Sequence, residues 1–196
     1  MPRIRKRALM KTFNHVLAHP EQHNQQTWAK VDPRELDKAT RLTKRRNEYE
    51  QEPGGFIDLN ISCGTTGCLA GWACALEGDK MYIPGAVFAG AFPYENLPYD
   101  EHLVISNVVT PEGEVVELSE RAVWHLGLTS GEYELTADRL FAPDNTLGYL
   151  RQAILQILNG NIYLHDEYRW YNPSDHDLPA DILKPIRYSA KTKEYV

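Results

Sequence analysis

Three cysteines gather in residues 63–74, and their thiols are the side chains of this chain best suited to chemistry. Cys68 lies where a helix is expected to begin, and the dipole at a helix N-terminus favours the thiolate form. A thiolate that has a histidine as its general base is a nucleophile for hydrolase or transferase chemistry. If the chain is such an enzyme, Cys63 or Cys68 is the nucleophile, and His125 or His165 is the base.

The same segment also has the composition of a helix packed inside the protein. A helix over residues 66–77 is apolar all round, and Gly67 and Gly71 recur at the spacing that lets another backbone approach closely. The sequence around Cys68 lacks the signature of papain-like hydrolases, so we favour inert, buried thiols. The predicted structural motif comprises Cys63, Gly64, Thr65, Gly67, Cys68, Leu69, Gly71 and Trp72.

Metal binding by the cysteines is disfavoured by their spacing. Cys68 and Cys74 are six residues apart on the expected helix, so their side chains point in different directions and cannot share one ion. An odd number of cysteines argues against a disulfide framework. A bridge from Cys63 to Cys68 would close a small loop and stabilise little.

Three histidines recur every four residues, at His15, His19 and His23. On an unbroken helix they would align, but Pro20 interrupts the helix between the second and the third. Residues 165–167 and 175–177 bring together histidine and acidic side chains, yet no helix fixes their geometry. We therefore predict no metal ion and no cofactor.

Composition and charge describe an ordinary globular chain. Its 196 residues are 42% hydrophobic and 24% charged, which fits one domain over residues 1–196 with a real core. No apolar run is long enough to cross a membrane, and the basic start lacks the apolar stretch of a secretory signal. We expect a cytoplasmic protein without a membrane partner.

The net charge of −6 is unevenly distributed, which bears on nucleic-acid binding. Residues 1–50 hold twelve Lys or Arg against six Asp or Glu, whereas the remainder is strongly acidic. Two expected helices around Gly127 have the shape of a helix-turn-helix, but the second carries mainly acidic side chains that would repel phosphate. An ordinary αα-hairpin is the better interpretation, and nucleic-acid binding through the basic N-terminal half is a secondary hypothesis.

The elements that must position these residues define an α+β fold, mainly α, with the cysteine segment as its central buried helix. Residues 30–55 read as a charged excursion containing a helix from Asp32 towards Glu50, and residues 160–196 as an aromatic, irregular C-terminal segment. Further expected elements are a helix before Pro20, a strand at 56–59, a β-hairpin over 103–118, and helices at 120–126, from Thr129 to before Pro143, and at 147–158.

Residues 63–73 read Cys-Gly-Thr-Thr-Gly-Cys-Leu-Ala-Gly-Trp-Ala. This run resembles the Cys-Gly-Thr-x-x-Cys-Leu-Ala-Gly-Trp-Ala element of a family of small actinobacterial and actinobacteriophage proteins that has no established activity. Residues 17–28 and 126–141 are similar to the elements that flank it in that family. The resemblance implies a small cytoplasmic protein, encoded by a phage and acting inside the host, and it supplies no catalytic residues.

No convergent catalytic set, phosphate loop or metal set stands out, so we expect a non-enzymatic accessory protein that binds another macromolecule, most simply a protein. The expected interface is aromatic, because such rings are enriched where proteins meet. Its candidate residues are Tyr94, Tyr99, Tyr163, Tyr168, Trp170 and Tyr171.

Overall fold

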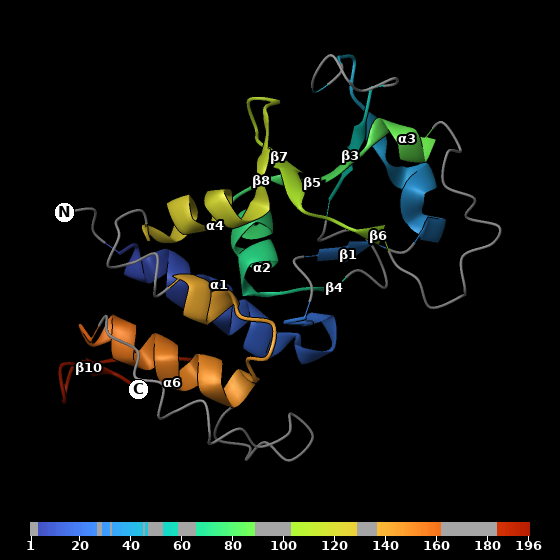
Figure 1. Cartoon of the computed structure of the whole chain (residues 1–196). Helices are drawn as coiled ribbons and strands as arrows, with labels where there is room; N and C mark the ends of the chain where they lie inside the picture. The colour runs from blue at the N-terminus through green and yellow to red at the C-terminus, as the bar shows by residue number, and fades with distance from the viewer. Residues whose placement is uncertain are drawn as a thin grey trace.

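Antiparallel sheets and a layer of helices make up this protein, and the expected α+β class is confirmed (Figure 1). The computed structural model describes residues 4–26, 29–31, 33–44, 46, 53–58, 66–88, 103–128, 137–161 and 184–196. In the helical layer, α2 (Leu69–Leu76) packs against both α1 (Lys6–Ala18) and α4 (Leu118–Leu126), and α6 (Leu147–Leu158) packs against α1.

Helix α1 is amphipathic, as the sequence predicts. Its buried face consists of Leu9, Thr12, Phe13, Val16 and Leu17. The cations Lys6, Arg7 and Lys11 are exposed. The helix ends at Ala18, and Pro20 begins the short 3-10 helix η1 (Pro20–Gln22), because proline has no N–H to continue the α-helical ladder.

Helix α2 is buried along almost its whole length, from Leu69 to Ala75. It begins three residues later than the predicted Thr66, because β4 (Thr66–Gly67) pairs with β1 (Ala29–Val31) and leaves Cys68 extended as the N-cap. Gly78 has φ 97° just beyond the helix, a left-handed conformation that glycine adopts without strain, so the predicted C-terminal glycine is confirmed.

A five-stranded antiparallel sheet has the order β2-β3-β5-β7-β8. Its strands are β2 (Thr40–Arg41), β3 (Gly55–Ile57), β5 (Lys80–Ile83), β7 (Asn107–Val109) and β8 (Val115–Glu117). The β7–β8 hairpin and the strand near Phe56 agree with the sequence prediction. Because only three residues separate the end of α2 from the start of β5, Asp79 lies at the junction between the buried helix and this sheet. Helix α3 (Gly85–Phe88) follows β5.

Two predictions for the strands and the charged excursion are wrong. The first half of the expected 103–118 hairpin is split, since β6 (Leu103–Val104) pairs with β1 in a separate sheet of order β4-β1-β6. Instead of a helix from Asp32, the chain forms the 3-10 helix η2 (Pro33–Lys38) and then β2, which pairs with β3. The segment has too few apolar residues to hold a helix against the core.

Helices α4 and α6 agree more closely with the sequence prediction. Helix α4 ends at Gly127, whose φ is 74°, and α6 spans the predicted 147–158, with the Thr146 hydroxyl accepting a hydrogen bond from the backbone N–H of Tyr149. Residues 137–141 are helical and end before Pro143. Most of the second helix of the expected αα-hairpin, 129–136, lies outside the described residues.

The end of the chain is more regular than predicted. Strands β9 (Tyr188–Ser189) and β10 (Glu194–Tyr195) form a hairpin instead of irregular structure, while 162–183 lie outside the described residues. The Asn14 amide on α1 exchanges two hydrogen bonds with the backbone of Ile186, at 2.8 and 3.1 Å. The Asn159 amide, just after α6, does the same with Tyr195.

One cluster of buried apolar side chains joins these elements, and its described members run from Ile4 to Ile186. None of the described helices combines the length and the apolar character that crossing a bilayer requires.

Candidate functional site

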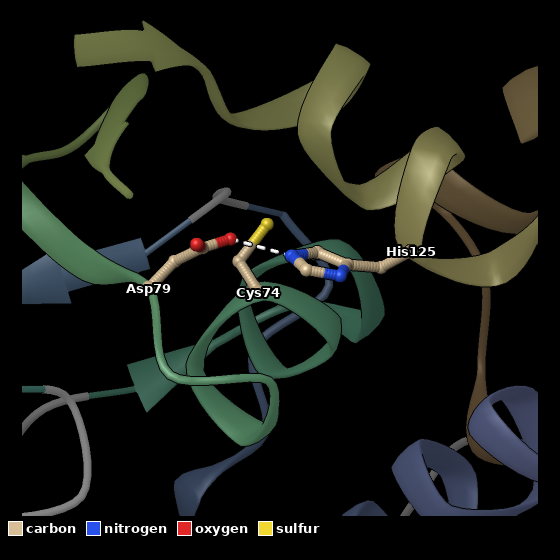
Figure 2. A group of neighbouring side chains, drawn as sticks. All are labelled: Cys74, Asp79 and His125. Atoms are coloured by element: carbon tan, nitrogen blue, oxygen red, sulfur yellow. Dashed lines mark hydrogen bonds and ion pairs between the residues drawn. The ribbon is translucent and has the colours of Figure 1, made fainter. Parts of the chain in front are cut away.

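A fully buried carboxylate, Asp79, links the end of α2 to helix α4. Its oxygens accept hydrogen bonds from Nε and Nη2 of Arg121, at 3.0 and 3.1 Å. Nε2 of His125 donates a third hydrogen bond to Oδ2 across 2.6 Å (Figure 2). Arg121 and His125 are four residues apart on α4 and so share one face of the helix, which explains how both reach the same carboxylate.

The electrostatics of this cluster favour the charged carboxylate. Burial by itself raises the pKa of Asp79, but the hydrogen bonds from His125 and Arg121 outweigh burial, so the pKa lies below its ordinary value. The hydrogen bond to Asp79 raises the pKa of Arg121. The Asp79–Arg121 pair is therefore a bidentate, charge-assisted contact, and it fixes the position of the guanidinium.

The thiol that lies in this cluster is Cys74, not Cys68. Its Sγ lies 3.5 Å from the backbone oxygen of Leu118, to which it donates a weak hydrogen bond. Burial, and then the charge of Asp79, raise the pKa of Cys74 well above its usual range. Cys74 is thus a neutral thiol and no nucleophile.

Sulfur, oxygen and nitrogen ligand atoms of Cys74, Asp79 and His125 lie within 4.8 Å of one another, the one such group among the described residues (Figure 2). This donor set matches the chemistry of zinc. However, Asp79 is already paired with Arg121, and a metal would have to take the Cys74 proton and the His125 hydrogen bond. The residues fit a structural ion-pair network better than a metal centre.

Cys68, a candidate nucleophile in the enzyme alternative, is also enclosed, as the favoured hypothesis of inert, buried thiols expects. Cys68 is buried, and burial raises its pKa to about 11. The structure brings His125 to Asp79 and Cys74, so the expected base is engaged elsewhere. The other candidates for catalysis, Cys63 and His165, lie outside the described residues.

The other described residues of the predicted structural motif are buried. Gly67, Leu69, Gly71 and Trp72 are buried, while Gly64 and Thr65 fall outside the described residues. The Gln25 amide accepts from the backbone N–H of Leu69 at 3.2 Å and donates to the backbone oxygen of Leu140 at 2.9 Å. This bridge ties the start of α2 to the helical turn at 137–141.

Of the histidines near Pro20, His15 contacts Trp72 and His19 contacts His15. The ring of His15 lies 4.5 Å from that of Trp72 and 4.9 Å from that of His19. Burial, and then the neighbouring His19, lower the pKa of His15. The expected acidic clusters at 165–167 and 175–177 are outside the described residues.

Above the Asp79 network, Trp124 is exposed, with 45% of its surface accessible. The guanidinium carbon of Arg121 lies 4.6 Å from its ring centroid, and that of Arg5 lies at 4.5 Å. The backbone N–H of Arg5 donates to the oxygen of Leu126 at 2.9 Å, which joins the start of α1 to the end of α4. Trp124 is therefore held by two cation–π contacts.

Strand β10, which carries Tyr195, lies near the end of the helical layer where α1 begins and α6 ends (Figure 1). Lys6 donates to the backbone oxygen of Leu158, and its ammonium lies 5.7 Å from the ring of Tyr195. The Tyr195 ring meets that of Tyr188, which is 56% exposed, edge to face at 5.3 Å. The cation–aromatic surface, as we name it, comprises Arg5, Lys6, Arg121, Trp124, Tyr188 and Tyr195.

Sequence reasoning missed this surface and the network below it. The aromatic interface residues that it proposed, Tyr94, Tyr99, Tyr163, Tyr168, Trp170 and Tyr171, all lie outside the described residues. A partial signal existed, because Arg121, Trp124 and His125 are neighbours at helical spacing. Nothing in the sequence indicated Asp79 as their partner, 42 and 46 residues away.

Comparison with known proteins does not assign this chain to a family. No family model, no curated protein and no solved structure gives a significant match to it.

Proposed function

We propose that this chain is a non-enzymatic accessory protein that binds another protein through the cation–aromatic surface. The observation that carries the proposal is the exposed ring of Trp124, held beside the guanidinium groups of Arg5 and Arg121. From the resemblance to the actinobacteriophage family, we also propose that this protein is phage-encoded and acts in the host cytoplasm. We also propose that the chain is a single, mainly helical domain.

An exposed tryptophan at this position costs stability. A tryptophan buries about 150–250 Å², so leaving 45% of it in water forgoes roughly 2 kcal/mol of hydrophobic stabilisation. Tryptophan, tyrosine and arginine are also the residues most enriched among those that dominate binding energy at interfaces. The surface combines all three types.

The surface is ordered before any partner arrives. Arg121 is fixed by the buried Asp79, and Arg5 is fixed by its backbone bond to Leu126 and its contact with Trp124. Side chains that are already immobile lose less conformational entropy on binding, which favours affinity. The enzyme alternative has less support, because both described thiols, Cys68 and Cys74, are buried with raised pKa values.

Affinity capture tests the proposal. Immobilised wild-type protein is compared with Trp124→Ala and with Val104→Ala, a matched control because Val104 is also exposed (54%) and lies outside the surface. We expect a captured host or phage protein that is lost with Trp124→Ala and kept with Val104→Ala. The interaction must then be reproduced with the purified partner. Equal capture by wild type and Trp124→Ala contradicts the proposal.

A further inference from the structure

The cations at the start of α1 differ in their pairing from Lys11, Lys80 and Arg121. Lys11 pairs with Glu77, Lys80 pairs with Asp58, and Arg121 pairs with Asp79. Among the described residues, none of the three cations at positions 5–7 has a carboxylate partner, and the first turn of α1 contains no acidic residue. In a chain with 27 Asp and Glu, this leaves a local excess of positive charge.

We infer that the cation–aromatic surface recognises an acidic segment of a partner protein, an inference that rests on the proposed function. The guanidinium of Arg5 lies over the Trp124 ring, and this cation–π contact leaves its N–H donors available for hydrogen bonds. The edge of Arg5 can therefore donate two parallel hydrogen bonds to a carboxylate. Trp124 supplies apolar contact beside that charge.

A nucleic acid fits the surface less well. Base stacking needs an open indole face, but two guanidinium groups already lie within 4.6 Å of the centre of the Trp124 ring. A long polyanion would also meet the acidic remainder of a chain whose net charge is −6. A short acidic segment could bind at Arg5, Lys6 and Arg7 without extending over that remainder.

The test uses a short fluorescein-labelled peptide of glutamates around a central leucine, with binding to the full-length protein followed by fluorescence anisotropy at low salt. We expect saturable binding that weakens about tenfold or more in Arg5→Glu and about fivefold in Trp124→Ala. Lys44→Glu makes the same change in net charge at an exposed site outside the surface and should leave the affinity within about twofold.

Two further probes are a lysine peptide of equal length and an oligothymidylate. Three results overturn the inference: no binding of the glutamate peptide, equal weakening by Lys44→Glu, or tighter binding of the oligothymidylate. If the glutamate peptide does not bind but protein capture still depends on Trp124, the acidic partner is wrong and the proposed function stands. If capture is also independent of Trp124, both fail.

Discussion

The carboxylate of Asp79 and the guanidinium of Arg121 meet through two hydrogen bonds at 3.0 and 3.1 Å in the protein interior, and the same guanidinium lies over the exposed ring of Trp124. A buried ion pair thus supports a surface side chain directly. Whatever disturbs Asp79 is expected to act on both stability and the surface.

Replacing Asp79 with Asn should lower the free energy of unfolding by about 3–5 kcal/mol, because removing one partner of a buried pair leaves the other uncompensated. Urea denaturation measures this change. The matched control is Glu77→Gln, which breaks the exposed pair with Lys11 and should cost less than about 1 kcal/mol. A loss below about 1 kcal/mol for Asp79→Asn would mean that the network contributes little.

The contribution of Asp79 should also depend on pH. Its folded-state pKa lies below the reference value of 3.8, so its stabilisation is complete above that value and disappears as the pH falls through the lower, folded-state pKa. The stability gap between wild type and Asp79→Asn should therefore narrow in acid. Urea titrations at several acidic pH values measure the gap, and a constant gap would contradict this assignment.

His15 should give the same protonation order as Asp79, but near neutral pH. Because burial lowers its folded-state pKa below 6.5, the unfolded chain takes up the proton first, and stability falls as the pH drops below about 6.5. His15→Gln cannot take up this proton, so it should lose less stability than wild type between about pH 7.5 and pH 5. Thermal melts of both proteins at these pH values measure the difference.

Helix α6 and the start of helix α2 illustrate what the sequence could and could not predict. The bounds of α6 were correct because its apolar period is a local signal. The start of α2 was wrong, because Thr66 and Gly67 are held in a strand by pairing with Lys30 and Ala29, far away in the chain. The Asp79 network was missed for the same reason, since its partners come from distant segments.

Gly54 should not tolerate even a methyl group. A Cβ added there would lie 2.5 Å from Cε2 of Tyr82 and 2.6 Å from the backbone oxygen of Ile83, so the β3–β5 pairing would have to shift. Gly54→Ala should therefore destabilise the protein by about 1–3 kcal/mol in urea unfolding. Gly113→Ala, at a turn with φ 87° and open space around it, is a comparison that tests backbone strain alone.

Alkylation of the cysteines should distinguish the proposed binding function from the alternative of a cysteine-dependent enzyme. Cys68, with a pKa of about 11, and Cys74 are both buried, so iodoacetamide near neutral pH should modify them slowly in the folded protein and quickly in urea. Peptide mass mapping identifies the modified residue. Rapid native modification of Cys68 would revive the nucleophile hypothesis.

The Asn14 and Asn159 side chains hold the last strands of the chain against α1 and α6. Tyr188 and Tyr195 are carried by those strands, whereas Arg5 precedes the first helix, so the surface joins residues more than 180 positions apart. A ribosome would synthesise Arg5 well before Tyr188 and Tyr195. The proposed docking surface would then form only after both tyrosines have been synthesised and β9 and β10 have closed on α1 and α6, so a shorter nascent chain could not yet use it.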